Sequence, residues 1–253
     1  MSVPESGLSY RDAGVDIDAK MRVVSKMKGM LNGAQTAAAG PIGHFGGTYF
    51  VPSGPDQVLV ASADGIGTKL KLAFTLGGDA HSGVGRDIVH HCDNDILALG
   101  AKPLFFLDYF ATGKLDSDVA LAVIGGIADA CEGTGLALIG GETAEMPEMY
   151  RDGEYDLAGF IVGTVAPENK IDGAAVEIGD VILGLPSNGL HTNGYSLARK
   201  IVGLTNEAEH DRELLAAILP GARETSIGEA LLATHLSYRR SVQPGLDAGL
   251  IRG

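Results

Sequence analysis

The sequence predicts an α/β fold, because apolar strand-like runs alternate with stretches of helical spacing. Residues 57–63 (QVLVASA) and 104–110 (LFFLDYF) are apolar and rich in strand-forming residues, as expected for buried strands. Residues 82–99 and 116–131 place apolar side chains at helical spacing around them. The hydrophobic content of 45% excludes a disordered chain. A length of 253 residues is enough for one large domain or two small ones.

The first 165 residues supply most of the predicted elements. The helix that starts near residue 116 has Asp116 or Ser117 as its N-cap, and Gly100 is a plausible C-terminal cap for the helix before it. In chain order we predict a helix over 21–31, a loop with a short strand over 32–54, a strand over 57–63, a helix over 82–99, a strand over 104–110, a helix over 116–131, and strands over 136–139 and 155–165.

The polar, glycine-containing stretch 166–180 is a candidate linker between two domains. We therefore predict an N-terminal domain over residues 1–167 and a second domain over 168–253. The second domain is predicted to contain a strand over 181–185, a helix over 195–202 behind Asn193, further helix from residue 207, and an amphipathic stretch over 236–250.

Composition and charge exclude several classes of protein. The formal net charge of −13 and the isoelectric point near 4.8 argue against a nucleic-acid partner, which would require a basic surface. Cys92 and Cys131 are too few for a disulfide framework or a four-thiolate zinc site. No signal peptide is visible, and the longest apolar stretch, 119–128, is too short to span a bilayer. We expect a soluble cytoplasmic protein without a membrane partner.

Three acidic residues next to Gly or Asn are the candidate metal ligands: Asp64, Asp95 and Glu142. Carboxylates combined with glycine turns suit Mg²⁺ that bridges to phosphate oxygens, because glycine lets backbone N–H groups approach the phosphates. The 37 glycines, about twice the usual share, fit such a role. Taken one at a time, however, each acidic position is more often an ordinary turn.

Other familiar motifs are absent or ambiguous. The chain has no Walker A sequence and no G-x-G-x-x-G after a strand. The run His90-His91-Cys92-Asp93 has metal-ligand composition, but neighbouring residues on a helix point apart and cannot hold one ion together. His191 lies in a polar loop that opens a helix, where it can assist proton transfer or simply belong to a capping loop.

Longer sequence strings resemble one family. LFFLDYFATGKLD (104–116) and GGETAEMPEMY (140–150) are highly specific, and the order of shorter motifs from Ser9 to Lys200 agrees. These strings resemble the AIR synthetases, the phosphoribosylformylglycinamidine cyclo-ligases of purine biosynthesis. FGAM synthetase, selenophosphate synthetase and thiamine-monophosphate kinase share only the short D-G-x-G, N-D and G-G-[ED] elements. The other matching strings are SYRDAGVDI (9–17), SADGIGTKLKLA (62–73), NDI (94–96), DLAGFIVG (156–163) and HTNGYSLARKI (191–201).

The resemblance implies a ligase that uses ATP and Mg²⁺. Formylglycinamidine ribonucleotide (FGAM) would be phosphorylated on its formyl oxygen and closed to aminoimidazole ribonucleotide (AIR), with release of ADP and phosphate. The implied fold is an α/β N-terminal domain whose sheet pairs with its twin in a homodimer, followed by an α/β C-terminal domain. Both subunits would line the active sites.

The resemblance also assigns roles to individual residues. The implied metal ligands are Asp64, Asp95 and Glu142, and the implied catalytic residues are His191 and Lys69. The implied ATP and phosphate contacts are Asp12, Gly14, Lys28, Gly65, Gly67, Thr68, Lys69, Gly140 and Gly141. The implied FGAM contacts are Ser187, Asn188, His191 and Asn193.

The sequence departs from the family pattern in three places. The usual V-N-D reads Asp93-Asn94-Asp95, and the usual G-G-F-G-G has His44 at its second position. The sequence ends at Gly253, before the family's H-[IL]-T-G-G-G loop, which indicates a C-terminally truncated chain with a partial second domain. Unpaired strand edges there would lower solubility or activity. Two alternatives therefore remain open: an inactive ATP-binding and dimerisation module, and another ATP-using enzyme of the superfamily.

Overall fold

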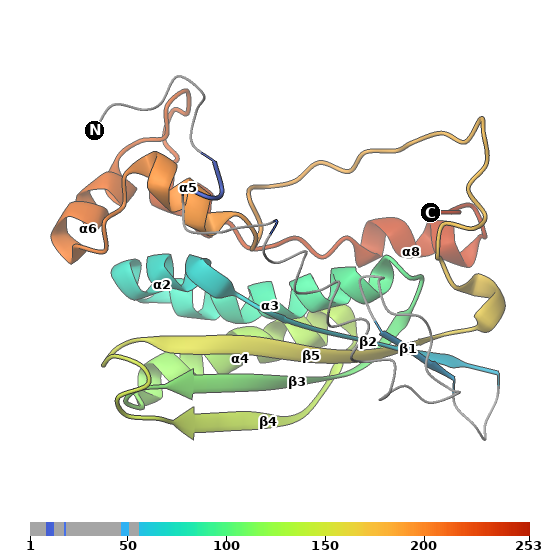
Figure 1. Cartoon of the computed structure of the whole chain (residues 1–253), viewed down its shortest axis with the longest axis horizontal. Coiled ribbons are helices and arrows are strands. Elements are labelled where there is room, and N and C mark those ends of the chain that lie inside the picture. Colours follow the sequence, from blue (N-terminus) through green and yellow to red (C-terminus); the bar gives the residue numbers. More distant parts are fainter. Residues whose placement is uncertain (1–8, 13–17, 19–46, 51–55) are drawn as a thin grey trace.

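A single mixed sheet forms the centre of the molecule in the computed structural model, which describes residues 9–12, 18, 47–50 and 56–253 (Figure 1). The predicted helix over 21–31, the His44 departure, and Gly14 and Lys28 lie outside these residues. The strands are β1 (Gly47–Phe50), β2 (Val58–Gly65), β3 (Lys102–Thr112), β4 (Ala137–Glu145) and β5 (Tyr155–Val165), and their order across the sheet is β1-β2-β5-β3-β4.

The strand directions explain the order. β5 runs antiparallel to both β2 and β3, whereas β3 and β4 are parallel. Parallel neighbours need a crossover connection, and helix α4 (Ser117–Thr134) supplies it. The α/β class predicted from the sequence is therefore confirmed. The bounds of β5 agree with those predicted, and the short strand expected within 32–54 is β1.

Helices cover one face of this sheet. α2 (Leu70–Leu76), α3 (Asp79–Leu97) and α4 pack there over a core that includes Ile88, Phe106 and Ile161, each fully buried. Glycine lets α3 and α4 approach closely, because a Cβ on Gly126 would lie 2.0 Å from the carbonyl oxygen of Ser82. As predicted, the Asp116 carboxylate caps α4 by accepting the backbone N–H groups of residues 118 and 119.

The opposite face of the sheet carries exposed apolar side chains. Leu107 of β3 pairs with Phe160 of β5, and Phe105 pairs with Val162, so these residues share one face. Phe160 is 44% exposed, whereas Ile161, its neighbour on the helix-covered face, is fully buried. An exposed apolar sheet face of this kind is typical of an interaction surface.

The chain after residue 170 lies over α2 and α3 (Figure 1). The predicted strand over 181–185 is wrong: this segment has no ladder partner within the described residues, and Ile182 is 96% exposed. The helices are α5 (Tyr195–Val202), with the bounds predicted, α6 (Ala208–Ala216), α7 (Ile227–Leu232) and α8 (Arg239–Asp247). The 167/168 domain boundary falls in the short 3-10 helix η3 (Pro167–Asn169) and stays a prediction.

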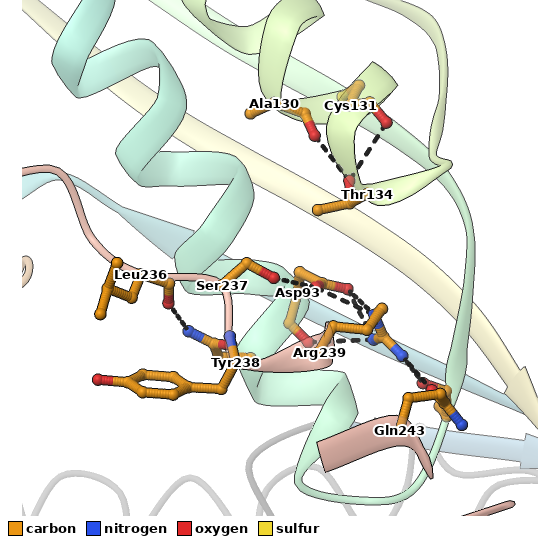
Figure 2. A network of polar contacts seen from close by, with 11 residues as sticks. Asp93, Ala130, Cys131, Thr134, Leu236, Ser237, Tyr238, Arg239 and Gln243 are labelled. Carbon is orange, nitrogen blue, oxygen red and sulfur yellow. Dashed lines mark hydrogen bonds and ion pairs between the residues drawn. The ribbon is translucent and has the colours of Figure 1, made fainter. Parts of the chain in front are cut away.

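Two buried ion pairs lie where this second part meets α3, and the Arg239–Asp93 pair joins the two directly. The Lys69 ammonium lies 2.7 Å from the Asp87 carboxylate, and Arg239 contacts the Asp93 carboxylate through both Nε and Nη2 (Figure 2). Arg239 thereby neutralises the charge that Asp93 adds at its departure from the family pattern. Among the described residues, none of the helices is long and apolar enough to cross a membrane.

Candidate nucleotide and metal site

Two of the three predicted metal ligands lie together. Asp64 ends strand β2, and Asp95 lies on α3 four residues after His91, which places Asp95 and His91 on one side of that helix. One ligand atom from each of these three residues lies within 4.8 Å of the other two. Ser62 is two residues before Asp64 on the same strand face, and its hydroxyl donates to Asp95 over 2.7 Å. Asp64 keeps 43% of its side chain exposed, so the group is open to solvent.

The electrostatics of this group follow from burial and close negative charge. Burial raises the pKa of Asp95, although the Ser62 hydrogen bond and the nearby His91 oppose the shift. Burial also acts to lower the pKa of His91, but the hydrogen bond and charge of Asp64, with the charge of Asp95, outweigh it and raise that pKa. Converging carboxylates whose negative charges are incompletely compensated fit a divalent cation.

The third predicted ligand does not join them. Across the sheet Asp64 pairs with Gly159, Gly159 with Asp108, and Asp108 with Gly141, so these residues share the helix-covered face. Glu142 is the next residue of β4, and its side chain therefore points to the other face. It also lies three strands from Asp64, about 14 Å at the usual strand spacing. Within one chain, the structure brings Asp64 and Asp95 together but not Glu142, whose role as a metal ligand stays a prediction.

Gly140 and Gly141 lie on β4, which pairs with β3, rather than beside Asp64. A Cβ on Gly141 would be 2.2 Å from the Asp108 carboxylate, so glycine is required for that contact. Gly140 has a φ of 156°. Burial raises the pKa of Asp108.

The turn after Asp64 has the open backbone that the sequence predicted. The Gly65 N–H donates to the Asp64 carboxylate over 2.7 Å. Gly67 has a φ of 64°, and no atom lies within 4 Å of where its Cβ would be. The exposed Thr68 shares a hydrogen bond with Ser196 of α5, which ties this turn to the second part of the chain.

Lys69 lies in the interior rather than at this open turn. Its side chain is 0% exposed, and besides Asp87 its ammonium donates to the carbonyl oxygens of His191 (2.9 Å) and Ala233 (3.0 Å). Burial lowers the pKa of Lys69 and raises that of Asp87, and their attraction opposes both shifts. All three ammonium protons have protein partners, and the predicted contact of Lys69 with phosphate or substrate stays a prediction. Lys69 anchors the His191 loop.

The predicted substrate loop surrounds His191. The His191 ring stacks on His235 at a centroid distance of 4.2 Å, and its Nε2 contacts the Tyr238 hydroxyl at 2.8 Å. Burial, followed by the charges of Lys69 and His91, lowers the pKa of His191. Asn188 donates to the Thr234 carbonyl over 2.8 Å. The other two predicted contacts are Ser187, which hydrogen-bonds the backbone of Gly189, and Asn193, which is exposed.

The described N-terminal segment reaches the same region. Ser9 donates to the Asp12 carboxylate through its hydroxyl (2.6 Å) and its N–H (2.9 Å), and these bonds lower the pKa of Asp12. The Tyr10 hydroxyl lies 3.2 Å from where a Cβ on Gly194 would be, just before α5. Asp12 is therefore near the α5 end of the site.

Of the histidines of this site, the sequence predicted His191 but not His91 or His235. As predicted, the four residues of the His90–Asp93 run diverge: His90 faces the His235 carbonyl, Cys92 is buried in the core, and Asp93 binds Arg239. His91, however, lies 3.0 Å from Asp64. Its four-residue spacing from Asp95 was the available signal. His235 has no motif around it that could have placed it here.

Comparison with known proteins finds relatives with a consistent description. Residues 46–165 match the family described as AIR synthase related protein, N-terminal domain. The chain is 54% identical over 229 residues to a phosphoribosylformylglycinamidine cyclo-ligase of Burkholderia multivorans. The N-terminal half of this chain is thus similar to the AIR synthase family, and most of its length is similar to the cyclo-ligases. A cyclo-ligase of Burkholderia ambifaria is 56% identical over 208 residues.

These matches cover a larger share of this chain than of its relatives. The alignments cover 88% and 81% of this chain but 65% and 59% of the two cyclo-ligases, so the chain spans less than two thirds of their length. A solved structure described as AaThiL complexed with AMPPCP and TMP shares the fold at a TM-score of 0.55. Its sequence identity is 16%, and the match covers 87% of this chain and 61% of that one. The resemblance inferred from the sequence motifs is confirmed.

Proposed function

We propose that this chain carries the ATP-dependent cyclisation of FGAM to AIR in purine biosynthesis. The observation that carries the proposal is the Asp64–Asp95 pair beside an open glycine turn, in a chain 54% identical to a cyclo-ligase. Nucleotide binding has support from the AaThiL fold neighbour, which was solved with AMPPCP. We also propose the cytoplasm as its location and exclude nucleic-acid and membrane partners, as the composition predicts.

Asp64 and Asp95 fit a Mg²⁺ ion, because both offer hard carboxylate oxygens at one solvent-open point. When bound, Mg²⁺ would neutralise charge on the ATP phosphates. Gly67 and Thr68 would present backbone N–H groups and a hydroxyl to those phosphates, and Gly65, which has no side chain, would let them approach. Gly140, Gly141 and Glu142 all lie on the edge strand β4, so they would have to act from there rather than beside Asp64. Asp12 would cover the nucleotide from the α5 side, and the proposed roles of Gly14 and Lys28 rest on the resemblance alone.

The reaction needs two bond exchanges. The formyl oxygen of FGAM takes the γ-phosphoryl group as the bond to ADP breaks, and the amidine nitrogen then attacks the activated carbon as phosphate leaves. The lowered pKa of His191 keeps its imidazole neutral, so it can accept the proton that the amidine loses. Ser187, Asn188 and Asn193 would orient FGAM beside it, and Lys69 would hold the His191 carbonyl in place.

A homodimer is the second part of the proposal. The open sheet face presents Phe105, Leu107 and Phe160, and a second copy of this face would bury them. Glu142 lies on the same face, so any metal role for it requires the partner subunit. We expect Phe160→Glu to convert a species of twice 26.1 kDa into one of 26.1 kDa in sedimentation velocity. A wild-type chain that sediments at the single mass would contradict the dimer.

An inactive ATP-binding and dimerisation module is the competing function. The exposed apolar segment around Ile182 is the observation that favours it, because the described residues leave these side chains uncovered. Calorimetry that shows nucleotide binding, combined with no turnover at high protein concentration, would support the module. The third possibility, another ATP-using enzyme of the superfamily, predicts ADP release with a substrate other than FGAM.

The deciding experiment is ADP release measured with and without FGAM. We expect release to depend on FGAM, and equal ATP hydrolysis without FGAM would contradict the cyclo-ligase. Asp64→Asn should lower turnover at least tenfold with an almost unchanged melting temperature. Asp56→Asn, an exposed position before β2, is the matched control and should leave turnover unchanged. Loss of folding in Asp64→Asn would instead show that Asp64 has a structural role in the turn.

A further inference from the structure

A chain of hydrogen bonds leads from Asn94 of α3 through His235 and Thr192 of the second part, and back through His91 of α3 to Asp64. It passes from Asn94 to His235 (Nδ2 to Nε2, 3.0 Å), from His235 to Thr192 (Nδ1 to Oγ1, 3.2 Å), and from Thr192 to His91 (Oγ1 to Nδ1, 2.9 Å). It ends with His91 Nε2 at 3.0 Å from Asp64 Oδ2. Thr192, His91 and His235 are all buried. The position of each proton along these hydrogen bonds follows from Asn94, where they begin.

Asn94 fixes the direction because backbone groups hold both ends of its amide. Its Oδ1 accepts the Tyr238 N–H over 3.0 Å, and its Nδ2 donates to the Leu236 carbonyl over 2.7 Å. A backbone N–H can only donate and a carbonyl can only accept, so the amide cannot be reversed. The second Nδ2 proton therefore points at His235, whose Nε2 must accept it.

His235 passes this direction on. Burial, followed by the charges of His191, His91, His90 and Lys69, lowers the pKa of His235 to about 3, so the ring carries one proton. Since Nε2 accepts, that proton is on Nδ1 and is donated to the Thr192 hydroxyl. Thr192 is left with its own single proton, which it donates to Nδ1 of His91. Neutral His91 then carries its proton on Nε2, facing the Asp64 carboxylate, and a second proton on the ring would leave Nε2 protonated as well.

We propose that Thr192 and His235 are positioning residues that hold His91 as an Nε2–H donor, and that His91 orients the Asp64 carboxylate without ligating metal. A protonated Nε2 has no lone pair for an ion, although it lies close to both carboxylates. With Gly65 N–H on Oδ1 and His91 on Oδ2, each Asp64 oxygen has a fixed partner. This inference rests on the proposed metal role of Asp64 and Asp95.

The first test is the proton position in the wild-type full chain without metal. Long-range ¹H–¹⁵N spectra distinguish the two neutral forms of each of the seven histidines, and the His91 signals are assigned by their loss in His91→Gln. We expect the Nε2–H form for His91 and the Nδ1–H form for His235. An Nδ1–H form of His91 would overturn the proposal, and this readout depends on neither ATP nor FGAM.

The second test measures binding of Mn²⁺ alone. Thr192→Val removes the hydroxyl at nearly constant volume and should weaken Mn²⁺ binding roughly 10- to 100-fold, the usual effect of a lost outer-shell partner. Thr192→Ser keeps the hydroxyl and should bind as the wild type does. Equal affinity of the Val variant, or ¹⁴N coupling to Mn²⁺ in the wild-type pulsed electron paramagnetic resonance spectrum, would overturn the proposal. A wild type that binds no Mn²⁺ would contradict the metal site itself.

Discussion

The two parts of this molecule are held together by different interactions. The sheet and helices α3 and α4 share one large apolar core that includes Val60, Ile88 and Phe106. The part after residue 170 buries a much smaller apolar cluster against Leu72 of α2, made of Tyr195, Leu215 and Leu231. It is attached to α3 mainly by buried polar groups. The first part is thus stabilised by the burial of apolar surface, and the second is positioned by a few directional contacts.

The Arg239 contact shows how specific the second kind of attachment is. Arg239 binds both oxygens of the fully buried Asp93 carboxylate, and its Nη1 donates to the Ala101 carbonyl and to Gln243 (Figure 2). An apolar core tolerates substitutions of similar size, whereas a buried ion pair loses its balance when either partner is removed. The comparison therefore predicts different responses in the two parts.

The largest effect is expected in the sheet core. Phe106→Ala should lower the free energy of unfolding by about 3–5 kcal/mol, because it leaves a cavity between β3 and α3. Circular dichroism melts are the measurement, since the chain has no Trp. Leu121→Ala on α4 is the control, because Leu121 is 71% exposed and should change stability by about 0.5 kcal/mol or less. An equal loss of stability at the two positions would contradict a core that is stabilised by the burial of apolar surface.

A somewhat smaller and more local effect is expected at α8. Arg239→Leu leaves the buried Asp93 carboxylate without its partner, at a cost of about 3 kcal/mol. Hydrogen exchange should show α8 amides losing protection while β5 amides keep theirs. The double variant Asp93→Leu/Arg239→Leu should recover most of the loss, because an apolar pair replaces the ion pair.

Arg240→Leu is the matched control for this ion pair. Arg240 is the next residue on the same helix, is exposed, and makes only a 3.5 Å contact with the Gly133 carbonyl. It should leave protection in α8 unchanged. Simultaneous loss of protection in α8 and β5 in Arg239→Leu would show that the two parts unfold as one unit and would end the distinction between them.

Local patterns in the sequence were sufficient for most elements of the fold. The bounds of β5 and α5 agree with the prediction because apolar periodicity over a full element is a local property. Helix α2 was missed because it is short and follows directly on the glycine turn. The strand over 181–185 was predicted from apolar composition, but a strand also needs a partner, which no local pattern can supply.

The site was predicted only where residue type alone decided the outcome. Asp64 and Asp95 converge as their motifs suggested. Glu142 lies apart from them, since a single residue along a strand reverses the face, and its metal role stays a prediction. The role predicted for Lys69 also stays a prediction, and its buried ion pair with Asp87 of α3, eighteen residues later, could not be read from local sequence. These outcomes depend on contacts between distant parts of the chain.

The smallest predicted effect uses pH to loosen the second part alone. His235 has a folded-state pKa of about 3 against an ordinary value of 6.5, so the unfolded chain binds its proton first as the pH falls. The stability that His235 contributes is therefore complete above about pH 6.5 and is lost toward pH 3. Between pH 6.5 and 5 the loss is about 2 kcal/mol, at about 1.4 kcal/mol for each unit. In His235→Gln this part of the pH dependence should disappear.

The location of the acid effect separates the two parts. His235 accepts the Asn94 amide proton and donates to Thr192, so a second proton on its ring breaks the contact with α3. Hydrogen exchange at pH 5 should therefore report opening of residues 233–247 while the sheet stays protected. The opposing shift at His91, whose pKa is raised, adds stability over the same range, so the wild type is compared with His235→Gln rather than with itself. Parallel pH profiles of the two proteins would show that His235 is charged in the folded state, against the hydrogen-bond order inferred above.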